Sequence, residues 1–178
     1  MEHTILFAGF GGQGILFSGK FLTYAGLMEG NQVTWLPSYG PEMRGGTANC
    51  SVVLSDTPVG SPVVNNPQYL VVMNGPSYDK FENAVQPGGL VVVDSSLIAR
   101  EPGRTDIQTV SIPAPNLASE KGLDGLANMI ILGKLLAHAS LCKQETLAAA
   151  MAKVVPERKR ALLEKNLEAI TLGLSYEG

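Results

Sequence analysis

Residues 9–14 (GFGGQG) carry four glycines in the spacing G-x-G-x-x-G. The segment follows a short apolar run and precedes a helical pattern, which is the setting in which this spacing binds phosphates. Glycine permits positive φ and a close approach of the backbone to a ligand, and a helix N-terminus presents free N–H groups to an anion. The segment therefore predicts an anion- or phosphate-binding loop, with candidate binding residues Gly9, Gly11, Gly12, Gln13 and Gly14. The alternative is a tight strand-to-helix turn that needs glycine for packing alone.

Residues 39–47 (YGPEMRGGT) form a second polar segment, in which Glu42 and Arg44 stand two apart between glycines. In an extended backbone, both side chains point the same way. Arg44 can hold a carboxylate or phosphate through two parallel hydrogen bonds, while Glu42 can hold Arg44 or accept a hydrogen bond from a substrate. These two are the candidate catalytic residues. The alternative is a local surface ion pair, worth about 0–1 kcal/mol.

Short apolar or alternating segments predict β-strands over residues 4–8, 32–36, 47–54, 69–73, 90–93 and 107–112. Pro37 is expected to end the second of these strands, and the third has a polar face with Asn49 and Ser51. Helical patterns cover residues 15–29, 77–85, 125–139, 144–154 and 157–173. Pro156 suits the first position of the last helix. The segment 125–139 is apolar on nearly all sides, so we expect it to be buried or to face another subunit.

This alternation predicts an α/β fold, a Rossmann-like and mostly parallel sheet with helices on both faces and a helical C-terminal third. No linker divides the chain, so residues 1–178 are expected to form a single domain. In such sheets, ligands bind at the carboxyl ends of the strands. Further candidate cofactor-binding residues lie there, namely Ser38, Tyr39, Gly45, Gly46, Thr47, Asn74 and Asp94. The alternative for Asn74 and Asp94 is that they cap the turns that follow.

A dinucleotide site also needs an acidic residue at the end of the second strand, where it binds the ribose. Pro37 and Ser38 occupy that place. Glu29 has about the right spacing, but it lies at the end of the first predicted helix, before the second strand begins. The sequence therefore disfavours an NAD site despite the glycine spacing.

The composition excludes several classes of protein. The net charge is -3 and no basic block is longer than residues 158–160, so nucleic-acid binding is not expected. The two cysteines, Cys50 and Cys142, form no CxxC, and there are only two histidines, so no metal site or iron–sulfur cluster is expected on this chain. No apolar run approaches about 18 residues, and no basic region opens the chain, so neither a membrane span nor a signal peptide is expected. These features are typical of a cytoplasmic protein with reduced thiols.

Residues 9–14, taken together with residues 37–50 (PSYGPEMRGGTANC), resemble the gamma subunit of 2-oxoacid:ferredoxin oxidoreductases. The resemblance continues through residues 60–62 (GSP), residues 87–89 (PGG) and Asn128-Met129, and it covers nearly the whole chain. The form YGPEMRGG is more similar to the branch that acts on 2-oxoglutarate or 2-ketoisovalerate than to the pyruvate branch.

The resemblance implies a subunit of a complex that oxidatively decarboxylates a 2-oxoacid to an acyl-CoA and reduces ferredoxin. It implies that thiamine diphosphate, Mg and [4Fe-4S] clusters belong to the partner alpha-, beta- and delta-type subunits, and that this chain shapes the approach of coenzyme A or substrate. Contact between residues 9–14 and the pyrophosphate of coenzyme A is our hypothesis. Two alternatives stay open, a stand-alone nucleotide-binding dehydrogenase domain and a purely structural subunit. The low charged fraction, 16% against a usual value of about 25%, indicates a well-filled core together with surface that a partner covers.

Overall fold

The computed structural model describes residues 1–38 and 47–178. Its strands form one sheet in the order β2-β3-β1-β4-β5-β6. They are β1 (Glu2–Phe10), β2 (Gln32–Ser38), β3 (Thr47–Ser55), β4 (Tyr69–Val72), β5 (Leu90–Asp94) and β6 (Gln108–Ile112). Strands β1, β4, β5 and β6 pair in parallel, whereas β3 runs antiparallel to both of its neighbours, β1 and β2. The predicted, mostly parallel sheet is confirmed, and the sequence did not indicate that β3 would separate β2 from β1.

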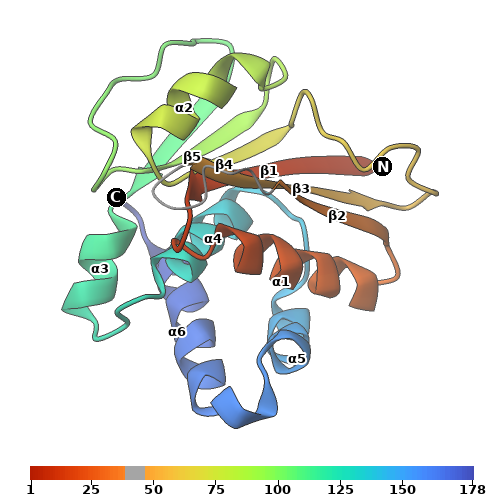
Figure 1. The fold of residues 1–178 in the computed structure, drawn as a ribbon, viewed down its shortest axis with the longest axis vertical. Coiled ribbons are helices and arrows are strands. Elements are labelled where there is room, and N and C mark those ends of the chain that lie inside the picture. Colours follow the sequence, from red (N-terminus) through yellow and green to blue (C-terminus); the bar gives the residue numbers. More distant parts are fainter. Residues whose placement is uncertain (39–46) are drawn as a thin grey trace.

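Helices cover both faces of this sheet, as predicted. They are α1 (Ile15–Met28), α2 (Gly75–Phe81), α3 (Ala114–Glu120), α4 (Ala127–His138), α5 (Gln144–Val154) and α6 (Ala161–Ser175), with short 3-10 turns η1 (Glu82–Ala84) and η2 (Glu157–Lys159). Figure 1 shows α2 above the sheet and α1, α4, α5 and α6 below it. The C-terminal third is helical, which is also as predicted.

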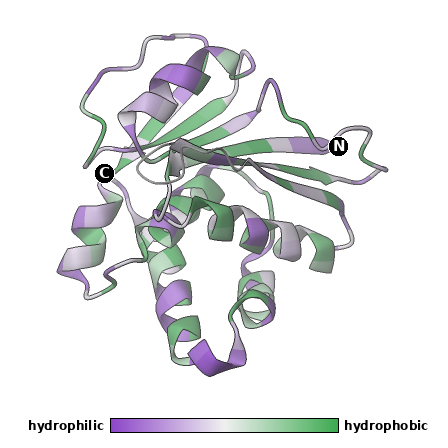
Figure 2. Ribbon diagram, viewed as in Figure 1, coloured by the Kyte–Doolittle hydropathy of each residue, from purple (hydrophilic) through white to green (hydrophobic). Residues whose placement is uncertain are grey.

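The period-two alternation of the strands builds a separate hydrophobic core on each face of the sheet. In β1, Ile5 and Phe7 point to the larger core beneath α1 and α4, while Leu6 and Ala8 point to the smaller core beneath α2. Figure 2 shows mostly hydrophobic central strands, and hydrophilic residues on α2 and α6. Burial on both faces explains why the central strands read as continuous apolar runs.

Helix α4 is buried on nearly all sides, as its sequence predicts, and it packs most extensively on α6. The two helices cross at Gly133 and Gly173, where a Cβ atom on either residue would collide with the backbone of the other helix. The crossing therefore requires glycine at both positions. It fixes α4 firmly, and the N-terminal turn of α4 is the part that reaches the glycine-rich segment.

Two expectations about the elements were wrong, and one helix was missed. Strand β2 continues through Pro37 to Ser38, because β2 is an edge strand, where a missing N–H can be tolerated. Helix α3 was not anticipated; it is only seven residues long and has no side-chain cap. The last predicted helix is divided into η2 and α6, and Pro156 precedes η2 as its N-cap instead of occupying its first position.

Within the described ranges, no helix combines the length and the apolar character needed to cross a membrane.

Candidate functional site

The sheet brings most of the predicted site residues that the structure describes to one edge, the one at which the parallel strands have their carboxyl ends. Strand pairing places Phe10 opposite Thr47, and Ser38 opposite Asn49, so the ends of β1 and β2 and the start of β3 meet there. Asn74 and Asp94 follow at the ends of β4 and β5 on the same edge. Tyr39, Glu42, Arg44, Gly45 and Gly46 lie outside the described residues. Since β3 separates β1 from β2, Ser38 is about 10 Å from the end of β1, at roughly 4.8 Å per strand.

Residues 9–14, hereafter the glycine loop, connect β1 to α1 through a backbone that needs glycine at particular positions. Gly12 and Gly14 have φ of 90° and 79°, while no described non-glycine residue, Gln13 included, has positive φ. Backbone whose φ alternates in sign in this way can turn successive N–H groups toward a common concave site for an anion. At Gly9, by contrast, an added Cβ would lie 2.7 Å from Gln13 Oε1 and 3.2 Å from Met73 Cβ, so glycine there serves packing.

Gln13 is a structural tie across the glycine loop. Its Oε1 accepts a hydrogen bond from the backbone N–H of Phe10 at 2.6 Å, and its Nε2 donates to the carbonyl of Met73 at 3.0 Å. The side chain thus joins the loop to the end of β4. Both ends of the amide are used inside the protein, which favours a role in shaping the loop over direct ligand binding.

The N-terminus of α1 begins at the glycine loop without a side-chain cap. The first internal hydrogen bond of the helix joins the N–H of Ser18 to the carbonyl of Gly14. The N–H groups of the first turn before Ser18 have no partner within the helix, as at every helix start. Together with the helix dipole, they offer a partial positive charge to an anion.

Two cavities border the glycine loop. One, of about 300 Å³, is lined mostly by apolar groups of the loop, of the first turn of α1 and of Ala48. The other, of about 410 Å³, lies between Gly12, Gly14 and the ends of α4, α5 and α6, with Asn128, Lys159 and Asn166 among its lining residues. Asn128 was not predicted as a site residue, although its amide stands out in the apolar segment 125–139 and could have been noticed there.

The side chains of Asn74 and Asp94 each accept a hydrogen bond from a backbone N–H group two or three residues later in the chain. Asn74 Oδ1 accepts a hydrogen bond from the N–H of Ser77 at 2.8 Å and caps α2. Asp94 Oδ1 accepts from the N–H of Ser96 at 3.0 Å, and the residue is fully buried. Burial raises the pKa of Asp94 to about 6. This geometry is the turn-capping arrangement that the sequence left open as an alternative, and neither side chain is accessible to a ligand in this structure.

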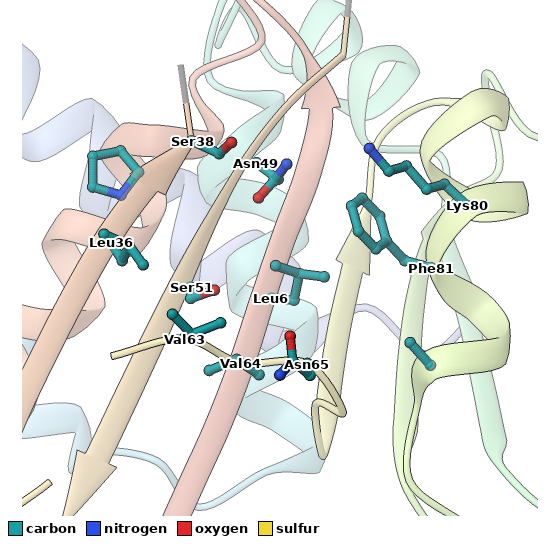
Figure 3. A pocket seen from close by; sticks show the side chains of 12 residues that line it. Leu6, Leu36, Ser38, Asn49, Ser51, Val63, Val64, Asn65, Lys80 and Phe81 are labelled. Atoms are coloured by element: carbon teal, nitrogen blue, oxygen red, sulfur yellow. The ribbon is translucent and has the colours of Figure 1, made fainter. Parts of the chain in front are cut away.

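The largest cavity described, about 530 Å³, opens on the sheet face that carries α2 (Figure 3). Its walls include Leu6 and Leu36 from the strands and Lys80 and Phe81 from α2, and the polar face of β3 lines its floor through Asn49 and Ser51. Among the predicted site residues that the structure describes, Ser38 alone borders this cavity. The alternation of residues 47–54 predicted the polar face but not the hollow above it.

Glu29, the acidic residue whose spacing suits a ribose contact, hydrogen-bonds another helix instead. Glu29 Oε1 accepts hydrogen bonds from the N–H of Lys143 at 2.5 Å and from the hydroxyl of Thr146 at 2.7 Å. It thus stabilises the start of α5, and it lies at the far end of α1, roughly 20 Å from the glycine loop at 1.5 Å per residue. This arrangement does not match the ribose contact of a dinucleotide-binding fold.

The cysteines do not fit an iron–sulfur cluster. Burial raises the pKa of Cys50 and of Cys142 to about 12, so both thiols stay protonated at neutral pH. A cluster is held by about four cysteines, whereas this chain has two, Cys50 and Cys142. In the described part of the chain, no three His, Cys, Asp or Glu side chains come together as a metal site.

Comparison with known proteins identifies the protein family of the chain. The sequence pattern of the pyruvate ferredoxin/flavodoxin oxidoreductase family matches residues 4–176. The chain therefore belongs to this family.

Two individual relatives are subunits of enzymes named for particular 2-oxoacids. The chain is 35% identical to the 2-oxoglutarate synthase subunit KorC of Methanocaldococcus jannaschii over 97% of this chain and 92% of the relative. It is also 35% identical to the ketoisovalerate oxidoreductase subunit VorA of Methanothermobacter thermautotrophicus over 98% of this chain. That match spans only 36% of the VorA subunit, so the chain corresponds to about a third of that relative.

Two solved structures share the fold. The gamma subunit of a keto/oxoacid ferredoxin oxidoreductase from Geobacter sulfurreducens superposes with a TM-score of 0.82 at 29% identity, covering 97% of this chain and 96% of that one. A 2-oxoglutarate:ferredoxin oxidoreductase from Magnetococcus marinus superposes with a TM-score of 0.85 at 26% identity, covering 97% of this chain and 30% of that one. The latter was solved with 2-oxoglutarate, coenzyme A and succinyl-CoA bound.

Proposed function

We propose that this chain is the gamma-type subunit of a 2-oxoacid:ferredoxin oxidoreductase, which converts a 2-oxoacid and coenzyme A to an acyl-CoA and reduces ferredoxin. The observation that carries the proposal is the end-to-end likeness to a gamma subunit, with 97% of this chain matched to 96% of the other. The 2-oxoglutarate synthase subunit of similar length supports the same conclusion. Since relatives of both kinds match, 2-oxoglutarate and 2-ketoisovalerate are the substrates we propose.

In this function, the bound thiamine diphosphate, Mg and [4Fe-4S] clusters supply decarboxylation and electron transfer, and alpha-, beta- and delta-type partners hold them. The two cysteines of this chain, fewer than the roughly four that hold a cluster, are consistent with that division. The part we assign to this chain is to receive the anionic portion of coenzyme A. The glycine loop, with two positive-φ glycines and the uncapped N-terminus of α1, has the chemistry that a pyrophosphate requires.

Reconstitution tests this function. The chain is co-expressed with alpha-, beta- and delta-type partners, and 2-oxoacid-dependent reduction of ferredoxin is measured with 2-oxoglutarate, 2-ketoisovalerate and pyruvate. We expect activity only in the assembled complex, whereas the chain alone is colourless and inactive. Turnover by the chain alone would contradict a subunit role. An active complex whose coenzyme A kinetics do not respond to any change in the glycine loop would favour the purely structural subunit.

The stand-alone dehydrogenase is not favoured. The chain belongs to a family of oxoacid oxidoreductases, and Glu29, the acid with suitable spacing, is bound to the start of α5.

A further inference from the structure

Asn128 lies 114 residues from Gly14 in the sequence but contacts it in the fold. The residue sits in the first turn of α4 and is only 5% exposed. Its Nδ2 donates a hydrogen bond to the carbonyl of Gly14 at 3.0 Å. A Cβ atom on Gly14 would lie 2.6 Å from the same Nδ2, so a side chain at this position would displace the amide of Asn128.

The carbonyl of Gly14 accepts hydrogen bonds from two residues. Besides Asn128 Nδ2, it accepts from the N–H of Ser18 at 3.1 Å. The hydroxyl of Ser18 lies 3.3 Å from this carbonyl and 3.3 Å from the carbonyl of Asn128, and its one proton is shared between them. The N-termini of α1 and α4 are therefore joined around a single backbone carbonyl, whose negative charge is committed to these donors.

The other end of the Asn128 amide takes no part in the contact with Gly14. No residue that the structure describes donates a hydrogen bond to Asn128 Oδ1, and Asn128 lines the cavity of about 410 Å³ together with Gly12 and Gly14. Lys159 lines the same cavity and adds a positive charge. Asn128 Oδ1 is not among the buried polar atoms that lack a partner in the described part of the chain. The contact that matters is therefore the one through Nδ2, which holds Gly14 beside this cavity.

We propose that Asn128 is a positioning residue that fixes the glycine loop in the conformation that binds the anionic part of the ligand. The proposal rests on the proposed function, in which this part is the pyrophosphate of coenzyme A. Asn128 keeps the Gly14 carbonyl engaged, so that the loop and the first turn of α1 present N–H groups and not a carbonyl to the anion. Without it, the loop samples other glycine conformations, and the apparent affinity falls with the fraction that remains competent.

The test replaces Asn128 and a matched control. Asn128→Ala removes the donor to Gly14, while Asn31→Ala removes a similar Nδ2 hydrogen bond, 3.1 Å long, to the carbonyl of Gly26 at the other end of α1. In the assembled complex, we expect Asn128→Ala to raise the KM for coenzyme A about fivefold to tenfold, with the KM for the 2-oxoacid unchanged. Asn31→Ala should lower the melting temperature but leave both KM values alone.

A second measurement uses inorganic pyrophosphate and calorimetry on the full chain. We expect Asn128→Ala to weaken pyrophosphate binding by the same factor and Asn31→Ala to leave it unchanged. An active complex in which both variants have equal KM values for coenzyme A overturns the positioning role and leaves the proposed function standing. If no active complex forms with any 2-oxoacid, the proposed function fails. Calorimetry then tests the positioning role of Asn128 by itself. That role is overturned if the wild-type chain does not bind pyrophosphate, or if the two variants bind it equally well.

Discussion

The chain ends β1 in one way and ends β4 and β5 in another, although all three strands finish at the same edge of the sheet. After β1, it turns through positive-φ glycines, and side chains from elsewhere, such as Asn128, hold the backbone in place. After β4 and β5, it turns through Asn74 and Asp94, whose own side chains bind the next backbone N–H groups and are buried. The first arrangement leaves N–H groups of the first turn of α1 without a partner inside the helix, whereas the second uses its polar side chains for folding. Position at the carboxyl edge alone therefore does not identify a binding residue.

The largest loss of stability should come from adding a side chain to the glycine loop. Gly14→Ala forces a positive φ on alanine and drives its Cβ against Asn128. Gly12→Ala imposes a similar φ where an added Cβ meets nothing within 4 Å. We expect Gly14→Ala to cost about 2–4 kcal/mol of unfolding free energy and Gly12→Ala about 1–2 kcal/mol, the strain alone. Denaturant unfolding of both variants measures the difference, and equal losses would mean that Asn128 does not limit the space at Gly14.

The pH dependence of stability tests the buried carboxylate at the end of β5. Because burial raises the pKa of Asp94 to about 6, against about 3.9 in an unfolded chain, the folded protein binds the proton more tightly. The Asp94 contribution to stability is therefore full below about pH 4 and declines as the pH rises through about 6. We expect Asp94→Asn, which cannot ionise, to be more stable than the wild type by about 1–2 kcal/mol at pH 7.5 and equal to it near pH 4.

Unfolding measured from pH 4 to pH 8 checks this prediction, with Asp124→Asn as the control at an exposed aspartate. Loss of stability at pH 7.5 in Asp94→Asn would mean that the ionised carboxylate has a partner that the described residues do not reveal.

A smaller loss is expected from the cap of α2. Asn74→Ala removes the acceptor for the N–H of Ser77, which typically costs about 1 kcal/mol. If Asn74 serves folding only, the affinity for coenzyme A should not change. Thermal unfolding and a coenzyme A titration of the same variant measure both quantities, and a large loss of affinity with little loss of stability would put Asn74 back among the binding residues.

The smallest expected effect is the change in melting temperature on addition of NADH. A ligand that binds the folded chain raises its melting temperature according to its concentration relative to Kd. Because Glu29 is bound to α5 and far from the glycine loop, we expect NADH to give no shift at a concentration at which coenzyme A gives one. The opposite ranking would favour the dehydrogenase interpretation.

Much of the fold could be predicted because it depends on local patterns. Buried parallel strands read as apolar runs, β3 shows its polar face through Asn49 and Ser51, and Gly30 ends α1 with a φ of 85°. The bounds of α5 were predicted as the structure has them. Elements without such a signal were missed, as α3 was, or misjudged, as at Pro37, where only the position of β2 at the sheet edge makes a proline acceptable.

By itself, the sequence determined the class of fold, the glycine loop and the resemblance to oxoacid oxidoreductase gamma subunits, since each is written in consecutive residues. Tertiary structure alone decided that β3 lies between β1 and β2, that Glu29 hydrogen-bonds the start of α5, and that Asp94 turns inward while Asn128 reaches Gly14. The physical reason is that a hydrogen bond between residues 114 positions apart, or the burial of a carboxylate, depends on which helices pack against which strands. Such packing joins distant segments and leaves no periodic trace in either one.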